Sequence, residues 1–375
     1  DAISFVRETE NVSFMEAVRI LADEAGMPMP AQDPKAQEKS DRRTQLAEVM
    51  EQAVQFFRLQ LKTGQATAAR DYLDQRGLRQ ETQDRFDIGF APDTRQALWS
   101  HLTGKGVAPD LIIDAGLAAK PDDGGAPYDR FRGRIIFPIR NPRGRCIALG
   151  GRAMSADARA KYLNSPETEL FDKGRSLYNQ GPAREAAGKE KRLIVAEGYM
   201  DVIALSEGGF GATVAPLGTA ITEDQLRLMW RIHHEPVIAL DGDTAGLRAA
   251  MRVIDIALPL LEAGKSLRFA LMPEGMDPDD LIKEQGASAM KTVLEGAVSL
   301  VDMLWQREVE AEPLTSPEAR AGLKDRIFAA LREIQHEEVR KQYQTALLAR
   351  FDAEFGRNFG RKKRVSNWKK QDTFV

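Results

Sequence analysis

The first long pattern of apolar residues in this chain has helical spacing and lies between residues 43 and 62. Apolar side chains recur there every three or four positions, at Leu46, Val49, Met50, Val54, Phe57 and Leu61. This spacing predicts an amphipathic helix packed against a core. An earlier helix is expected over 13–26, begun by a capping box of Ser13 and Glu16. A further helix should end near Gly77.

Short apolar runs replace the helical spacing later in the chain. Residues 134–139 and 146–149 predict two strands joined by a hairpin turn at 141–144. After residue 192, apolar runs and helical patterns alternate, which predicts βαβ units and a largely parallel sheet. The expected strands are 193–196, 212–215, 237–240 and 267–271, and the expected helices are 199–207, 223–232, with Thr222 and Gln225 as its cap, and 245–263. Residues 289–355 are helical in period and lack strand signals.

Composition narrows the classes of protein. The chain has 375 residues with 43% hydrophobic and 29% charged residues, which fits a globular protein of two or three domains. No apolar run is long enough to span a bilayer and no signal peptide is visible, so we expect a cytoplasmic protein without a membrane partner. Cys146 is the only cysteine and there are four scattered histidines, so no zinc site is expected.

The net charge of −3 conceals an uneven distribution. Residues 128–175 carry eleven Arg and Lys against five Asp and Glu, and residues 355–371 carry seven against none. A single charged run is usually a solvated face. Two basic segments on either side of an acidic one indicate instead a polyanion held near metal ions.

Three acidic clusters follow expected strands in the region between. They contain Glu197 and Asp201, then Asp241 and Asp243, then Asp277 and Asp279. Because ligands bind at the carboxyl ends of strands in open α/β sheets, we expect these carboxylates to converge. An oxygen-rich site of this kind suits Mg²⁺ or Mn²⁺ and phosphoryl transfer.

Each cluster taken alone also has a plain structural interpretation. An acidic helix N-terminus or an Asp cap in a turn would account for any of them, and Asp279 or Asp280 could cap a helix near Leu281. Gly198 is expected to let the chain bend after its strand, and Gly242 to clear room for a phosphate. The conjunction of three clusters on successive βα units favours bound metal, because repulsion among the free carboxylates would raise their pKa values.

The basic segment supplies candidate phosphate contacts. Its cations lie beside small residues in Gly-Gly-Arg at 150–152 and Lys-Gly-Arg at 173–175. Arginine grips phosphate through a planar fork and lysine acts as a point charge. Tyr162, next to Lys161, is able to stack on a base. The alternative is that these cations only protect strand edges.

Residues 161–168, 197–201, 241–243 and 277–279 together resemble the bacterial replicative DNA primases, the DnaG family, and the carboxylate part resembles the Toprim module. The resemblance implies a multi-subdomain α+β and α/β fold with a mixed α/β basic part, a mostly parallel sheet flanked by helices, and a helical part. It divides the chain into the end of an upstream zinc ribbon (1–26), a linker (27–43), an RNA-polymerase-like basic subdomain (44–189), the Toprim subdomain (190–290), a helical subdomain (291–355) and a basic flexible tail (356–375).

The resemblance implies an enzyme that makes short RNA primers on single-stranded DNA from ribonucleoside triphosphates, using two or more Mg²⁺ or Mn²⁺ ions. The replicative helicase is an expected partner, through a C-terminal domain that we do not find in the sequence. Asp241, Asp243, Asp277 and Asp279 are implied metal ligands, and Glu197 is either a ligand or a general base. Asp201, Gly198 and Gly242 are supporting residues. The candidates for nucleotide and template contacts are Arg132, Arg152, Lys161, Asn164, Lys173 and Arg175.

Two other classes of function stay open on the sequence. A Toprim nuclease or topoisomerase would use the same carboxylates, and Tyr343 is a weak candidate for the topoisomerase nucleophile. A non-catalytic module that binds single-stranded DNA would keep the carboxylates for structure alone.

Overall fold

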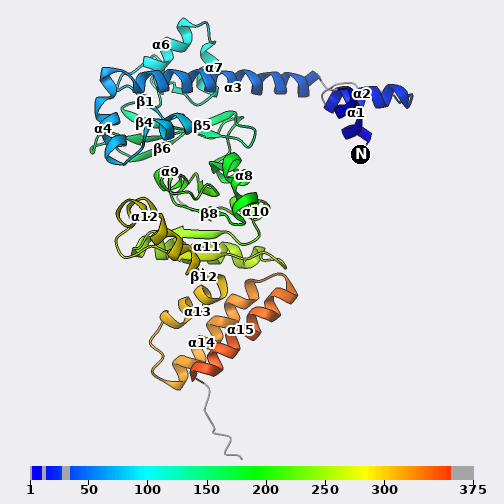
Figure 1. The fold of residues 1–375 in the computed structure, drawn as a ribbon, viewed down its shortest axis with the longest axis vertical. Helices are drawn as coiled ribbons and strands as arrows, with labels where there is room; N and C mark the ends of the chain where they lie inside the picture. Colours follow the sequence, from blue (N-terminus) through cyan, green and yellow to red (C-terminus); the bar gives the residue numbers. More distant parts are fainter. Residues whose placement is uncertain (1, 11–13, 28–33, 219, 356–375) are drawn as a thin grey trace, which may run out of the picture.

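The computed structural model describes residues 2–10, 14–27, 34–218 and 220–355. Three units follow one another along the long axis of the molecule (Figure 1). The first is a mixed α/β unit under the long helix α3, the second is built on a six-stranded sheet, and the third consists of helices. The expected fold class is therefore confirmed.

The basic subdomain is organised around a four-stranded antiparallel sheet of order β1-β4-β5-β6. All six apolar residues that predicted a helix over 43–62 are buried in α3, which packs on this sheet. The expected hairpin is also present, and the Gly144 N–H donates to the Asn141 carbonyl across its turn. The elements are α3 (Pro34–Leu61), η1 (Gly64–Ala66), α4 (Thr67–Gln75), α5 (Gln80–Arg85), β1 (Gly89–Ala91), α6 (Ala97–Gly104), α7 (Pro109–Asp114), β2 (Ala118–Ala119), β3 (Tyr128–Asp129), β4 (Arg134–Arg140), β5 (Cys146–Ala153), β6 (Tyr162–Asn164), η2 (Lys173–Arg175), β7 (Leu177–Tyr178) and α8 (Gln180–Glu190).

The N-terminal half of α3 differs from expectation. Residues 34–43 were predicted to belong to a linker, yet α3 begins at Pro34. This stretch has no apolar stripe, so its periodicity gives no helical signal. Its Lys, Gln, Glu and Ala residues are nevertheless good helix formers, and extending a helix from a packed segment requires no new nucleus. Proline is tolerated in the first turn.

The second unit contains four parallel strands flanked by two antiparallel ones, in the order β12-β11-β10-β8-β9-β7. Both edge strands come from outside 190–290: β7 precedes the segment, and β12 lies in a region predicted to lack strands. At two residues each, these strands are too short to produce a sequence pattern. The elements are β8 (Ile194–Val195), α9 (Tyr199–Glu207), β9 (Thr213–Pro216), α10 (Glu223–Ile232), β10 (Val237–Leu240), α11 (Thr244–Ala257), η3 (Leu258–Leu260), β11 (Arg268–Leu271), α12 (Pro278–Glu295) and β12 (Val298–Ser299).

Helices cover both faces of this sheet. Ile194 and Ala239 belong to a core that includes residues of α9 and α12, while Val195 and Ile238 belong to one that includes residues of α10, α11 and α13. Adjacent residues of one strand thus enter different cores, which explains why the strands read as continuous apolar runs. The predicted cap of α10 is present, with Thr222 and Gln225 bonded to each other's backbone N–H groups.

The third unit consists of α13 (Leu300–Glu310), α14 (Pro317–Glu333) and α15 (Glu337–Phe355). It confirms the expected helical subdomain after β12. Helix α11 ends before the predicted residue 263, because Pro259 and then Gly264 follow it and the chain continues as the short η3 turn. The tail predicted over 356–375 lies outside the described residues.

Near the N-terminus, α1 (Ala2–Glu10) and α2 (Phe14–Glu24) form a helical pair. Helix α2 confirms the helix expected over 13–26, and Gly26 follows it with a φ of +62°. The predicted cap residue Ser13 lies outside the described residues. No described helix combines the length and apolarity needed to cross a bilayer.

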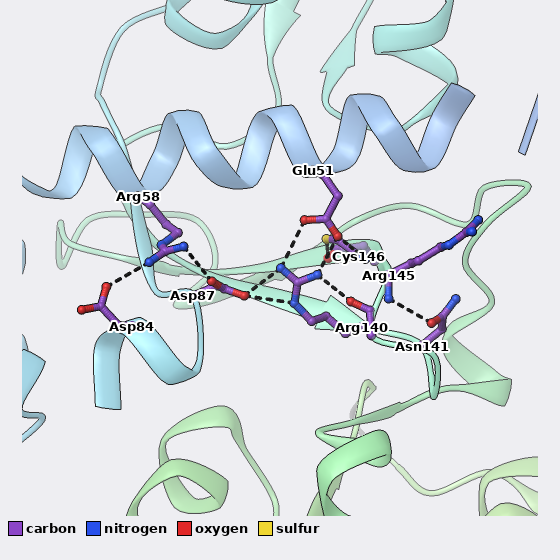
Figure 2. Close-up of polar contacts among 10 residues, drawn as sticks. Glu51, Arg58, Asp84, Asp87, Arg140, Asn141, Arg145 and Cys146 are labelled. Carbon is purple, nitrogen blue, oxygen red and sulfur yellow. Dashed lines mark hydrogen bonds and ion pairs between the residues drawn. The ribbon is translucent and has the colours of Figure 1, made fainter. Parts of the chain in front are cut away.

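An ion-pair network ties the β4–β5 hairpin to α3 (Figure 2). Arg140, the last residue of β4, lies 2.6 Å from Glu51 of α3 and 2.7 Å from Asp87, and it donates to the Gly144 carbonyl at 2.7 Å. Glu51 also accepts the Cys146 N–H at 2.9 Å. The hairpin is therefore held at its turn and at the start of β5, which fixes its position under α3.

Candidate metal and nucleotide site

The acidic clusters converge at one edge of the six-stranded sheet. Strands β8, β10 and β11 run parallel and in register, with Val237 opposite both Ile194 and Arg268. Their carboxyl ends therefore lie side by side. Glu197 follows β8, Asp241 follows β10, and the loop after β11 leads to Asp277. The convergence predicted from the sequence is present.

Asp241 is the carboxylate of this edge that has a buried oxygen without a hydrogen bond. Its Oδ1 is buried and has no hydrogen-bond partner among the described residues. Burial, reinforced by the charges of Glu197, Asp277, Asp243 and Asp280, raises the pKa of Asp241 to about 7. Partial burial likewise raises the pKa of Glu197. A buried anion without a donor is unfavourable, so this oxygen is a strong candidate to meet a cation.

Asp201 supports the edge from the first turn of α9. Its Oδ2 accepts the Gly198 N–H at 2.9 Å, which closes the turn after β8. Burial, together with the charges of Asp277, Asp241 and Asp279, raises the pKa of Asp201 to about 8. The residue is therefore electrostatically part of the acidic cluster, in addition to its capping role.

The third cluster is the tightest. Asp277, Asp279 and Asp280 each offer an oxygen within 4.8 Å of the others. Asp277 caps α12, which begins at Pro278, and accepts the Asp280 N–H at 2.7 Å. The cap predicted at Asp279 or Asp280 is thus two or three positions too late. Asp279 is buried and lies 2.5 Å from Arg76 of α4, in the other subdomain.

Two glycines have roles that differ from the predicted ones. A Cβ on Gly242 would lie 1.9 Å from the Pro273 carbonyl oxygen, so this glycine lets the β10 and β11 loops approach each other. The room it leaves is filled by backbone, not kept for a phosphate. Gly198 has extended backbone, with a φ of −137°, so its turn does not depend on left-handed geometry.

The donor set fits a hard divalent cation. All the converging groups are carboxylates, one buried oxygen is unpartnered, and three aspartates lie within reach of one ion. One oxygen of Asp243 is already hydrogen-bonded, because Oδ1 caps α11 by accepting the N–H groups of Ala245 and Gly246. Its second oxygen is left for a ligand.

A hollow of about 330 Å³ connects this edge to the basic subdomain. Lys161, Tyr162 and Asn164 line it from β6 and the preceding loop, together with Arg76. The acidic side of the lining includes Glu197, Asp201 and Asp277. Cations and carboxylates from segments over a hundred residues apart thus share one cavity.

The other predicted basic residues do not line this hollow. The Arg152 guanidinium lies 3.7 Å from the centre of the Tyr72 ring, and Arg132 is over Tyr128. Arg175 is paired with Asp224 at 2.9 Å. The Lys173 backbone N–H donates to the Glu167 carboxylate. Lys161 and Asn164 are therefore the candidates that the structure brings to the carboxylates.

Comparisons with known proteins agree with this architecture. Residues 56–184 match the family model of the DNA primase catalytic core, N-terminal domain, and residues 191–270 match that of the Toprim domain. The solved DnaG primase catalytic domain bound to single-stranded DNA is 37% identical, with a TM-score of 0.75 over 83% of this chain and 97% of that one. The chain belongs to the DnaG primase family.

Other relatives in this family are similarly close. The DNA primase of Escherichia coli K12 is 38% identical over 91% of this chain and 58% of that protein, so the chain spans little more than half of its relative. A DNA primase domain from Pseudomonas aeruginosa has a TM-score of 0.77 and 37% identity, covering 81% of this chain and 95% of that one.

Within the Toprim domain, Tyr199 joins the two halves of the site, a role that the sequence did not reveal. Its hydroxyl donates to Asn164 Oδ1 at 2.6 Å, and its ring stacks on Phe137. A Cβ on Gly150 would lie 2.4 Å from the Tyr199 ring, so the small residue before Arg152 accommodates this aromatic. The tyrosine fixes β6, and with it the Lys161 segment, against the acidic edge.

Arg76 and Asp280 were also missed as site residues. Arg76 is about 200 positions from its partner in sequence, and a single arginine in a short helix gives no signal. Asp280 was considered only as a cap, although its carboxylate lies in the cluster with Asp277 and Asp279. Only the tertiary contacts between the end of α4 and the start of α12 reveal the first, and only the position of the α12 cap reveals the second.

Proposed function

We propose that this chain is the catalytic core of a DNA primase, a template-directed RNA polymerase that makes short primers on single-stranded DNA. The observation that carries the proposal is the shared hollow in which Lys161 and Arg76 lie opposite Glu197, Asp201 and Asp277. A triphosphate is the kind of ligand that needs cations on one side and metal-bearing carboxylates on the other.

In the proposed reaction the 3′-hydroxyl of the growing primer attacks the α-phosphate of an incoming ribonucleoside triphosphate. The new phosphodiester bond forms as the bond to pyrophosphate breaks. Mg²⁺ or Mn²⁺, two ions or more, would lower the pKa of the hydroxyl and neutralise charge on the leaving group. Asp241, Asp243, Asp277 and Asp279 are the proposed ligands.

The protein groups position the reactants around this centre. Lys161 supplies positive charge for the triphosphate, and Asn164, held by Tyr199, orients the strand that carries it. Glu197 is a further metal ligand or accepts the hydroxyl proton. Its raised pKa suits a proton acceptor. Asp279, paired with Arg76 in the free protein, becomes available to metal when the arginine turns to phosphate.

The template and the site of action follow from the family. The related catalytic domain was solved with single-stranded DNA, and we propose the same class of template here. Arg132 and Arg152, which lie over the half-buried rings of Tyr128 and Tyr72, are proposed template contacts. We further propose that the chain acts at the replication fork in the cytoplasm, with ribonucleotides and an RNA primer as its other partners.

The structure gives no support to a topoisomerase nucleophile at Tyr343. This residue packs against the core of the helical unit, and burial raises the pKa of its hydroxyl to about 12. A nucleophile that forms a bond to DNA must be accessible and activated, whereas Tyr343 is half-buried and its pKa is raised.

One assay tests the proposal against its alternatives. The chain is incubated with single-stranded template, labelled ribonucleotides and Mn²⁺, and the products are scored as new RNA, cut DNA or neither. New RNA that requires template supports the proposal. Cut DNA without ribonucleotide would identify a nuclease, and metal-independent DNA binding without products would identify a binding module. The exposed acid Asp325, changed to Asn, is the matched control for each carboxylate variant.

A further inference from the structure

A second basic site lies on the opposite end of β4 from the proposed template contact Arg132. It is a surface hollow of about 330 Å³ between the N-terminal half of α3 and the β4–β5 hairpin. Three arginines line it, Arg43 from α3 and Arg143 and Arg145 from the hairpin. Ser40, Thr44 and Asn141 add hydroxyl and amide groups.

These arginines do not stabilise the fold through ion pairs. None of the three pairs with a carboxylate among the described residues, whereas their neighbour Arg42 pairs with Asp114 and Arg140 pairs with Glu51 and Asp87. All three are exposed. Three unpaired guanidinium groups around one hollow repel one another, and an anion is the ligand that would relieve this repulsion.

The hairpin holds two of the arginines in fixed positions. The Asn141 side-chain oxygen accepts the N–H groups of Arg143 at 2.9 Å and Arg145 at 3.1 Å. Arg140 clamps the same turn through the Gly144 carbonyl. Figure 2 shows the Arg145 side chain extending away from this network. The backbone of the site is thus preorganised while the guanidinium groups stay available.

The lining indicates which anion fits. No aromatic ring lines the hollow, and its remaining residues are aliphatic, so nothing there stacks on a base. A free nucleotide would find phosphate contacts but no base contact. A nucleic-acid backbone needs only the phosphate contacts, which position a strand without reading its sequence.

We infer that Arg43, Arg143 and Arg145 form a phosphate site for the DNA template strand, separate from the catalytic hollow. The inference rests on the proposed function for its choice of DNA. The seven residues of β4 span about 23 Å between Arg132 and the hairpin at 3.3 Å per residue. A strand stacked as in a duplex, at 3.4 Å per nucleotide, needs about seven nucleotides to reach both ends of β4, and an extended strand needs fewer.

The test compares DNA affinity as a function of salt for two triple variants of equal charge. R43A/R143A/R145A removes the site, and R184A/R231A/R332A removes three exposed arginines elsewhere as the matched control. Fluorescence anisotropy is measured with a 30-nucleotide and a 5-nucleotide single strand, without ribonucleotides. Circular dichroism and the melting temperature verify that both variants fold, which is expected because every changed side chain is exposed.

For the long strand we expect the site variant to bind at least about tenfold more weakly at low salt. Its salt slope should fall by about 2, at roughly 0.7 for each lost phosphate contact with single strands. The control variant should show neither change, and the loss should be smaller with the short strand, because it makes fewer phosphate contacts at once. Equal affinity and slope in the two variants would overturn the inference.

Two further comparisons complete the test. The first distinguishes free phosphate from DNA phosphate as the ligand, and the second distinguishes a failure of this inference from a failure of the proposed function. If inorganic phosphate at millimolar concentration protects the parent but not the site variant from thermal unfolding, while DNA binding is unchanged, the ligand is free phosphate and the DNA assignment is wrong. Because the readout is binding, a chain that makes no primers but shows the expected loss of slope would contradict only the proposed function. Primer synthesis with an unchanged slope would contradict only this inference.

Discussion

The Arg140 network and the acidic edge are both dense clusters of charge, yet they differ in one respect. In the network each carboxylate faces a guanidinium or a backbone N–H, as Glu51 does with Arg140 and Cys146 (Figure 2). At the edge, three carboxylates lie within 4.8 Å of one another with only Arg76 as a cationic partner among the described residues, and the buried Asp241 Oδ1 has no donor there. Charges that are matched within the fold hold structure, whereas unmatched like charges mark the place where a ligand binds.

The largest expected effect is on catalysis at the unmatched edge. Asp241→Asn should reduce nucleotide addition at least about 100-fold, since removing a metal ligand loses several kcal/mol of transition-state stabilisation. Asp243, Asp277 and Asp279 changed to Ala should behave alike. Primer extension with Mg²⁺ and with Mn²⁺ measures this, with Asp325→Asn as the control. If any two of the four variants add nucleotides at nearly the parental rate, the assignment of these aspartates as metal ligands is wrong.

Substitutions in the Arg140 network should change the stability of the protein. Arg140→Ala leaves Glu51 with only the Cys146 N–H and Asp87 with only Arg58, and it should lower the free energy of unfolding by about 2 kcal/mol. Arg58→Ala removes a contact with the exposed Asp84 and one with Asp87, which keeps Arg140, so it should destabilise the protein less than Arg140→Ala does. Urea unfolding measures both. If the variant at 140 is as stable as the one at 58, the network is not structural.

The acidic edge should also affect stability, in a way that depends on metal and on pH. The pKa of Asp241 is raised in the folded protein, so its ionised form destabilises the fold, and the penalty builds up as pH rises from about 4 to about 7 and is fully present above that. In chelator, Asp241→Asn should therefore stabilise the protein at pH 8, by roughly 1–2 kcal/mol after solvent screening is discounted, and have no effect at pH 4.

Urea unfolding of parent and variant at the two pH values provides the measurement. Saturating Mn²⁺ should abolish the gain at pH 8, because the ion replaces the missing positive charge. A gain that is equal at both pH values would show that the carboxylate is not strained by its neighbours.

The smallest expected effect concerns the cations. Lys161→Ala should weaken ribonucleotide binding about threefold, a loss of roughly 0.7 kcal/mol typical of an exposed charge contact, without changing stability. Arg175→Ala should do less, because its guanidinium is already paired with Asp224. Equilibrium binding at two salt concentrations compares them, with exposed Lys189→Ala as the control. A larger effect at 175 would reverse the order of the two assignments.

Much of the fold was predictable because it depends on local signals. The spacing of Leu46, Met50 and Phe57 determines which face of α3 packs, and the Thr222–Gln225 capping box determines where α10 begins. The order of strands and acidic loops in the Toprim part was also predicted, since each apolar run and its following turn lie together in sequence. These features require no knowledge of what packs against them.

The same sequence did not determine how the subdomains meet, because contacts between distant segments leave no local pattern. It placed Glu197, Asp241 and Asp277 at strand ends, but only the parallel register made them neighbours. It offered five basic candidates and Asn164, and only the packing of Tyr199 under Gly150 brings Lys161 and Asn164 to the carboxylates. Arg76 reaches Asp279, and Arg43 reaches the hairpin, through folding alone, since the free energy of such contacts depends on tertiary proximity that no periodicity encodes.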